Sequence, residues 1–230
     1  MALIVFSTGS SGEPKPIVYT EKDLKRFHDH TWKWVKIQQW PDGVRYNMWP
    51  YVPHIASYAL YDIATREPDL HFTLPMMEDR LEKFVYLFKK FKPALIAGLP
   101  RHVQKVISMA NRDDLEELKM IQMGSDTMEQ ELFNEIRTIC PNKIRFISAY
   151  GATEFKQIFF TCKEFDSGYH IDVGSFQLEN NELVYTGGEL KDYHSGDTGR
   201  IVTEPCPYCG FSGQRLFDIR RIKGEKKYKY

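Results

Sequence analysis

Short apolar runs alternate with longer amphipathic segments through the first two thirds of the chain, and this alternation limits the fold more than any other feature. The expected strands are residues 2–6, 45–49, 70–74, 94–97, 118–123 and 143–149. The expected helices are residues 21–39, 55–64, 79–91, 101–110 and a segment from about residue 126 to 136. Strands that alternate with helices predict an α/β fold with a mainly parallel sheet flanked by helices.

The pattern changes after about Gln157. Short β-rich segments separated by turns are expected at residues 158–161, 173–178, 183–186 and 199–203. They predict a smaller, antiparallel or barrel-like subdomain. We therefore expect two domains, an α/β core over residues 1–157 and a β-rich subdomain over residues 158–230. A chain of 230 residues that is 42% hydrophobic is long and apolar enough to build both.

Charge and cysteine content exclude several classes of protein. The 31 basic and 31 acidic residues balance, which argues against nucleic acid as a partner. No apolar run reaches the roughly 20 residues that span a membrane, and the start lacks the basic region of a signal peptide. Four cysteines without a secretory signal indicate reduced thiols or metal ligands, and hence a cytoplasmic protein.

The segment Ser7–Lys15 combines four hydroxyl side chains, two glycines and a lysine directly after an apolar run. Hydroxyls and free backbone N–H groups can surround a phosphate, and glycine lets the backbone approach it closely. The lysine adds a positive charge. These features predict binding of a nucleotide triphosphate. A flexible Gly/Ser linker is the alternative, because a glycine-rich loop alone is weak evidence.

Three further polar loops follow expected strands: residues 124–126 (Gly-Ser-Asp), 150–154 (Tyr-Gly-Ala-Thr-Glu) and 195–199 (Ser-Gly-Asp-Thr-Gly). Ligands of open α/β sheets bind at the carboxyl ends of the strands, so these loops could form one site. Each loop also has an ordinary explanation. Tyr150-Gly151 could be a strand-ending turn, and Asp197 could belong to a hairpin turn between two glycines.

The order and spacing of these four motifs resemble the adenylate-forming superfamily. That superfamily contains acyl- and aryl-coenzyme A ligases, luciferases and non-ribosomal adenylation domains. The resemblance implies ATP- and Mg²⁺-dependent activation of a carboxylic acid, aromatic by analogy, as an acyl-adenylate with release of pyrophosphate. Coenzyme A, a carrier protein or an amine would then accept the acyl group.

The resemblance also implies a role for each motif. The phosphate loop comprises Ser7, Thr8, Gly9, Ser10, Ser11, Gly12 and Lys15. The adenine site comprises Gly124, Ser125, Asp126, Tyr150 and Gly151, with the tyrosine stacked on the base. Thr153 would meet the α-phosphate and Glu154 would hold magnesium, which makes them catalytic residues together with Lys15. His54, which follows Trp49-Pro-Tyr-Val-Pro, would line the acyl pocket. A purely structural role is the alternative for this histidine.

The last implied roles concern the ribose. Asp197 would bind both ribose hydroxyls, and Arg215 is the candidate for an arginine nearby. A carboxylate suits a diol because it accepts two hydrogen bonds at once. The overall chemistry also fits these residue types, since a carboxylate that attacks a phosphate must overcome like-charge repulsion. Loop N–H groups, hydroxyls and Mg²⁺ spread that charge.

The cysteines point to a second kind of site. Cys206-Pro-Tyr-Cys209-Gly has the spacing of a zinc knuckle. We expect Cys162 and His170 to complete a structural zinc site, and the phenylacetate–coenzyme A ligase branch is similar in having cysteine-containing segments here. Cys140 is the alternative fourth ligand. Free thiols without metal, or a thioredoxin-like redox pair, are the other possibilities.

The resemblance covers the central core only. Full-length relatives have a long region before the phosphate loop and a C-terminal subdomain that supplies a catalytic lysine, and Glu225 replaces the usual hinge arginine. We therefore expect a minimal enzyme that makes acyl-adenylates without forming a thioester, or one subunit of a split enzyme. The alternative is a non-catalytic nucleotide- or acyl-binding scaffold. In each case we expect a homo-oligomer or a partner subunit.

Overall fold

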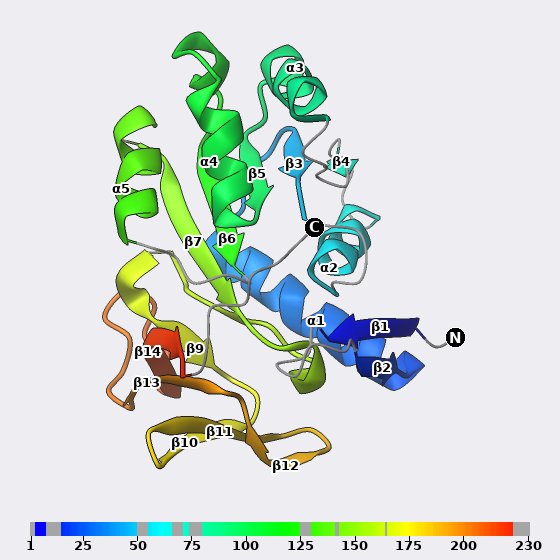
Figure 1. Ribbon diagram of the computed structural model, residues 1–230, viewed down its shortest axis with the longest axis vertical. Helices are drawn as coiled ribbons and strands as arrows, with labels where there is room; N and C mark the ends of the chain where they lie inside the picture. The colour runs from blue at the N-terminus through cyan, green and yellow to red at the C-terminus, as the bar shows by residue number, and fades with distance from the viewer. Residues whose placement is uncertain are drawn as a thin grey trace.

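The structure, a computed structural model, describes residues 3–7, 15–49, 55–65, 71–73, 80–124, 130–140, 143–163 and 165–222. Its centre is a nine-stranded sheet of order β13-β14-β9-β8-β7-β6-β5-β3-β4 (Figure 1). The parallel strands are β3 (Arg45–Asn47), β4 (His71–Thr73), β5 (Leu95–Gly98), β6 (Met120–Gly124) and β7 (Arg145–Tyr150). The antiparallel strands are β8 (Phe159–Phe160), β9 (Tyr169–Ile171), β13 (Asp197–Val202) and β14 (Gln214–Arg221).

Helices cover both faces of the parallel half. One face is covered by α3 (Leu81–Phe91), α4 (Pro100–Ser108) and α5 (Gln130–Ile139). The other is covered by α1 (Glu21–Gln38) and α2 (Ile55–Ala64). Between the layers, Ile96 and Ile121 pack toward α4, whereas Ala97 and Ile147 pack toward α1 and α2. The structure confirms an α/β sheet flanked by helices.

The long helix α1 begins and ends with clear local signals. Thr20 caps it: Asp23 N donates to the Thr20 hydroxyl at 3.2 Å, and Thr20 N donates to the Asp23 carboxylate at 3.0 Å. Its end is marked by Gln39, whose backbone is left-handed (φ 51°). On its buried face, Trp34 packs against Phe160 and Cys206 of the antiparallel region. One helix therefore contacts both halves of the sheet.

The β-rich region begins where the pairing changes. Strand β7 pairs with β6 in parallel and with β8 in antiparallel fashion, so the change falls just after Gln157. A separate three-stranded sheet contains β10 (Ser175–Glu179), β11 (Glu182–Gly187) and β12 (Leu190–His194) and lies at the lower end of the molecule in Figure 1. Because β8, β9, β13 and β14 continue the main sheet, the division into two domains at residue 157 stays a prediction.

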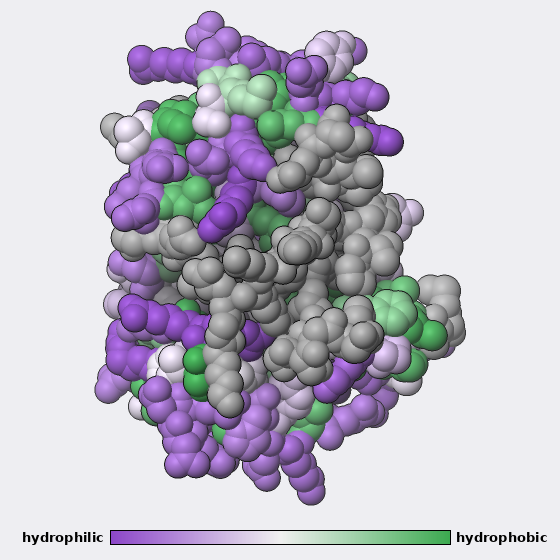
Figure 2. All heavy atoms as spheres, viewed as in Figure 1, coloured by the Kyte–Doolittle hydropathy of each residue, from purple (hydrophilic) through white to green (hydrophobic). Residues whose placement is uncertain are grey.

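The first expected strand is not part of the main sheet. Strands β1 (Leu3–Ser7) and β2 (Lys15–Tyr19) form an antiparallel hairpin beside α1. Instead of being buried throughout, the hairpin has two faces. Val5 and Tyr19 face the core, while Ile4 and Val18 are exposed, and Figure 2 shows hydrophobic side chains gathered here.

Among the described residues, no helix has the length and apolarity needed to span a membrane.

Candidate functional site

Strands β6 and β7 end side by side at Gly124 and Tyr150, two of the predicted site residues. A β-carbon on Gly124 would lie 2.3 Å from the carbonyl oxygen of Ala149, so this position accepts only glycine. At Gly151 an added β-carbon would lie 2.9 Å from the carbonyl oxygen of Gln157. Both glycines therefore allow a close backbone approach at the carboxyl edge of the sheet. The predicted neighbours Ser125 and Asp126 lie outside the described residues.

Asp197 lies beside Tyr150, although the two are distant in sequence. The Tyr150 hydroxyl donates to Asp197 Oδ2 at 2.9 Å, and Arg221 Nη1 lies 2.8 Å from Asp197 Oδ1. Burial and the Asp197 carboxylate raise the pKa of Tyr150 well above its usual value, so the tyrosine stays a neutral donor. Two predicted motifs therefore meet at one aspartate whose position is held from both sides.

The turn before Asp197 is tied to strand β11. The Ser195 hydroxyl donates to Leu183 O at 2.6 Å, and Gly196 N donates to Glu182 Oε1 at 2.7 Å. Asp197 N in turn donates to the Ser195 hydroxyl at 3.1 Å. These bonds fix the turn, and with it the start of β13 where Asp197 stands.

Glu154 belongs to a short 3₁₀ helix, η3 (Thr153–Phe155), that follows β7. Its carboxylate is partly exposed and accepts a hydrogen bond from Tyr193 of β12. Burial and the negative charge of Glu154 raise the pKa of Tyr193 to about 12. The neighbouring Thr153 carbonyl accepts a hydrogen bond from the Tyr19 hydroxyl at 2.8 Å. The helix is therefore held by the three-stranded sheet and by the β1–β2 hairpin.

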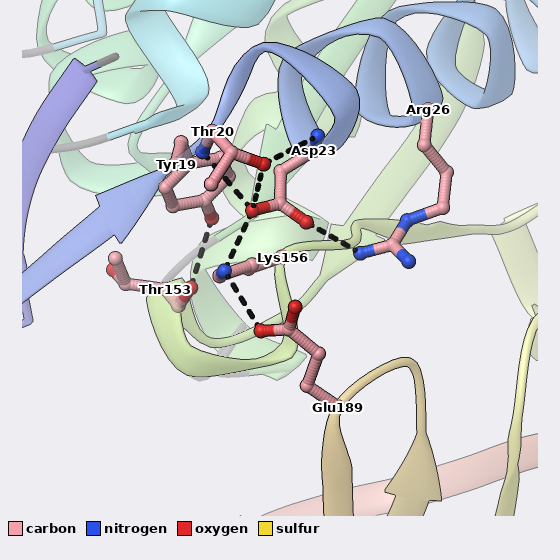
Figure 3. Close-up of polar contacts among 7 residues, drawn as sticks. All are labelled: Tyr19, Thr20, Asp23, Arg26, Thr153, Lys156 and Glu189. Carbon is pink, nitrogen blue, oxygen red and sulfur yellow. Dashed lines mark hydrogen bonds and ion pairs between the residues drawn. The ribbon is translucent and has the colours of Figure 1, made fainter.

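Lys156 ties η3 to two other elements (Figure 3). Its ammonium group lies 2.7 Å from Asp23 of α1 and 3.3 Å from Glu189, which lies between β11 and β12. Arg26 also pairs with Asp23, at 3.1 Å. Burial by itself would raise the pKa of Asp23, but hydrogen bonds from Lys156 and Thr20 outweigh it and lower the pKa. The ion pairs therefore stabilise the folded protein through a charged, buried carboxylate.

Replacing Lys156 with methionine is expected to destabilise the fold by about 2 kcal/mol, because Asp23 would lose a charged hydrogen bond while only 4% exposed. The stability that the lowered pKa of Asp23 contributes is present at neutral pH and is lost as the pH falls through that pKa. The variant should therefore lose less stability on acidification. Urea unfolding at neutral and acidic pH measures both effects. Lys25→Met, which removes an exposed pair with Asp29, is the control, and equal losses in the two variants would contradict the prediction.

The β1–β2 hairpin carries the ends of the predicted phosphate loop. Ser7 pairs with Lys15 at the last register position before residues 8–14. Ser7 is buried, and its hydroxyl has no hydrogen-bond partner among the described residues, whereas Lys15 is exposed. Strand β1 also lies against η3. The remaining predicted loop and pocket residues lie outside the described part of the chain: Thr8, Gly9, Ser10, Ser11, Gly12 and His54.

Arg215 is not brought to Asp197. Its guanidinium donates to the Ser167 carbonyl at 2.9 Å and to the Glu204 carbonyl at 3.3 Å. The arginine beside Asp197 is Arg221, its partner at one end of the β13–β14 pair, whereas Arg215 lies six residues earlier in β14 and pairs with Val202 at the other end. Sequence reasoning also missed Tyr193. The strands that carry Tyr193 and Arg221, β12 and β14, are rich in charged residues. They therefore lack the alternation of apolar and polar residues by which a strand is predicted from sequence.

The predicted zinc ligands gather in one place. The ligand atoms of Cys162, His170, Cys206 and Cys209 all lie within 4.8 Å of one another. The first three residues are buried and Cys209 is exposed. Cys140, the alternative ligand, packs instead in the core beneath α3, α4 and α5. The structure therefore groups the four predicted ligands and places Cys140 apart from them.

A family model described as AMP-binding enzyme matches residues 1–203. The chain belongs to the AMP-binding enzyme family. The predicted resemblance is thereby confirmed. A comparison with curated proteins gave no significant match. Among solved structures, this member of the family resembles a 2-hydroxyisobutyryl-CoA ligase in complex with 2-HIB-AMP and CoA, with a TM-score of 0.80 at 15% identity.

Two further solved structures are similar to this AMP-binding family member. A long-chain-fatty-acid-CoA ligase from Archaeoglobus fulgidus has a TM-score of 0.68 at 15% identity over 96% of this chain. An acyl-CoA synthetase (AMP-forming)/AMP-acid ligase II-like protein from Dyadobacter fermentans has a TM-score of 0.64 at 17% identity over 94%. At these identities the likeness establishes the fold. This chain matches 96% of its own length to 52% of the 2-hydroxyisobutyryl-CoA ligase, and it spans 51% and 59% of the other two.

Proposed function

We propose that the protein binds Mg-ATP and a carboxylic acid and forms an acyl-adenylate with release of pyrophosphate, in the manner of the phenylacetate–coenzyme A ligase branch. One observation carries the proposal. Tyr150 at the end of β7, four residues before Glu154, donates a hydrogen bond to Asp197, which comes from a motif far away in sequence. Family membership over residues 1–203 supports the same activity.

The nucleotide site suits an adenosine group. Asp197 accepts from Tyr150 and pairs with Arg221, and a carboxylate has about four acceptor positions in all, which suits a ribose diol. The Tyr150 ring offers an aromatic surface for adenine beside Gly124, which has no side chain to obstruct it. Arg221 replaces Arg215 in this proposal as the arginine near the ribose.

Phosphate and magnesium fit the adjoining residues. Mg²⁺ commonly binds one or two carboxylates together with phosphate oxygens, and Glu154 is a partly exposed carboxylate positioned by Tyr193. When bound, the ion would neutralise phosphate charge. Ser7 contributes a buried hydroxyl with no partner among the described residues, and Lys15 contributes a cation. Thr153 would hold the α-phosphate in line with the acid, which lowers the entropic cost of the reaction.

Detection of the product tests the proposal. The protein is incubated with Mg-ATP and a panel of aromatic and aliphatic carboxylic acids, and acyl-AMP is sought by mass spectrometry. We expect an acyl-AMP of matching mass with at least one acid, and none when magnesium or the acid is omitted. Absence of every acyl-AMP under conditions in which ATP binds would overturn the enzymatic proposal.

A scaffold or nucleotide-binding subunit is the second candidate, and the cluster of Cys162, His170, Cys206 and Cys209 favours it because four protein ligands suit a structural metal rather than a catalytic one. In that case the chain would associate with a partner or a second copy, and coenzyme A, a carrier protein or an amine would be used elsewhere. Ligand linkage separates a scaffold from any nucleotide-binding protein, because Mg-ATP at 100 times its dissociation constant adds about 2.7 kcal/mol of stability. Product detection then separates the enzyme from a nucleotide-binding subunit. A scaffold without a nucleotide site shows no such gain. A cytoplasmic location is part of the proposal for both.

A further inference from the structure

A cluster of three cysteines and one histidine uses none of the proposed nucleotide residues. Cys162 follows β8, His170 lies in β9, and Cys206 and Cys209 lie in the connection between β13 and β14. We infer that these side chains bind one Zn²⁺ ion, and that the ion fastens the β13–β14 connection to the middle of the main sheet. This inference does not depend on the proposed function.

The spacing of the ligand atoms matches a tetrahedral ion. Zn–S bonds of about 2.3 Å place two thiolates roughly 3.8 Å apart, and a Zn–N bond of about 2.0 Å places nitrogen roughly 3.5 Å from sulfur. The Cys162 and Cys206 sulfurs are 3.9 Å apart, and the Cys209 sulfur is 3.3 Å from His170 Nε2. All four ligand atoms fall within 4.8 Å of one another. One ion at their centre can reach them all.

The histidine is oriented for metal binding. His170 Nδ1 lies 3.2 Å from the carbonyl oxygen of Phe160, which can only accept a hydrogen bond. The proton is therefore on Nδ1, and the lone pair is on Nε2, which faces Cys209. A ligating histidine usually donates its other N–H to a carbonyl or carboxylate in this way. The ring is also held between Trp34 of α1 and Phe211, with ring centroids 5.2 and 4.9 Å away.

The turn that carries the two nearby cysteines is already closed. Gly210 N donates to the Cys206 carbonyl at 2.8 Å, and Cys206 N donates to the Phe211 carbonyl at 2.8 Å. Gly210 is left-handed (φ 74°), a conformation that glycine adopts without strain. The turn therefore presents both sulfurs to the same point without needing the metal to fold it.

A structural role follows from the ligand set. Four protein ligands fill a tetrahedral zinc ion and leave no position for a substrate. Three of the four residues are buried, and Trp34, Phe160 and Phe211 surround them with apolar side chains. The ion would join β8, β9 and the β13–β14 connection. Two of these elements, β8 and β9, are strands of only two and three residues.

Metal analysis of the full chain, purified without a metal-affinity tag, tests the inference. We expect one zinc per chain, and after replacement by Co²⁺ we expect the intense visible bands of a tetrahedral site together with thiolate-to-cobalt charge transfer. Cys209→Ser changes the exposed ligand and should abolish stoichiometric binding. Cys140→Ala removes a thiol outside the cluster and should leave the metal content unchanged.

Stability gives a second readout. Removal of zinc by a chelator should lower Tm by about 10 °C, and added zinc should restore it. Cys209→Ser should show the lower Tm whether or not chelator is present. Zinc well below one ion per chain, together with a Tm that neither chelator nor added zinc changes, would overturn the inference. A Cys162–Cys206 disulfide in protein purified under reducing conditions would also overturn it.

Discussion

Replacing Glu154 with glutamine is expected to slow acyl-adenylate formation by at least about 100-fold, because a neutral amide is a poor ligand for Mg²⁺ and leaves phosphate charge uncompensated. The change keeps the size of the side chain and its ability to accept from Tyr193. The fold should therefore remain intact, with a Tm close to that of the unmodified protein. Single-turnover formation of acyl-AMP at saturating ATP measures the effect.

A matched control distinguishes this effect from a general loss of negative charge. Glu135 is an exposed residue of α5, on the face of the sheet away from α1. Glu135→Gln removes the same charge and should leave the rate unchanged. If Glu154→Gln retains the unmodified rate across a range of magnesium concentrations, Glu154 is not the magnesium ligand.

Replacing Asp197 with asparagine should weaken ATP binding by about 10- to 100-fold. The change removes a charged acceptor and one of the two oxygens that the ribose diol would use, and a hydrogen bond to a charged group contributes about 1.5–3 kcal/mol. It also leaves Arg221 without its ion pair, so some loss of Tm is expected. Equilibrium titration with ATP and with a 2′,3′-dideoxy analogue measures the effect. The two ligands should differ in affinity for the unmodified protein but much less for the variant.

Asp218 offers the control for this experiment. It lies in β14, and its pair with Arg200 is exposed on both sides. Asp218→Asn should leave ATP affinity unchanged. An Asp197→Asn variant that binds ATP as tightly as Asp218→Asn would contradict the ribose role.

The helical and parallel part of the fold was predictable because its residues obey simple periodicities. Helix α2 covers the expected residues 55–64, and α1 ends one residue before the expected limit. Strands β5, β6 and β7 are buried on both faces, so they appear in the sequence as short apolar runs. Such runs also predict where loops leave the sheet, which is how Gly124 and Tyr150 were placed at one edge.

The antiparallel part was harder to predict because its strands do not alternate cleanly. Strand β14 contains three arginines and an aspartate, and Asp218 is left-handed (φ 56°) near a register shift opposite Thr198 and Arg200. An irregularity of this kind breaks the apolar period of two. The strand was therefore missed, and with it the pairing that places Arg221 at Asp197. Register is a long-range property that the local sequence of β14 does not contain.

The hairpin β1–β2 shows a different limit. Its first strand is apolar enough to suggest burial, but pairing leaves Ile4 and Val18 exposed on one face. The zinc ligands are easier to predict from the sequence, because Cys206 and Cys209 are close in sequence and chemically distinctive. Cys162 is the better partner in the sequence because it lies in the β-rich region eight residues before His170, whereas Cys140 falls at a helix end before Pro141. The fold separates the two, since Cys140 lies in the core beneath α4 and α5.

Isotope exchange between pyrophosphate and ATP tests the proposed acyl-adenylate chemistry most directly. Label enters ATP only if the enzyme forms acyl-AMP and pyrophosphate and then reverses that reaction with labelled pyrophosphate. With Mg²⁺ and a suitable carboxylic acid, we expect transfer of labelled pyrophosphate into ATP, dependent on the acid and lost in Glu154→Gln. No exchange with any acid, from protein whose Tm rises with Mg-ATP, would contradict it and leave a nucleotide-binding subunit without adenylating activity.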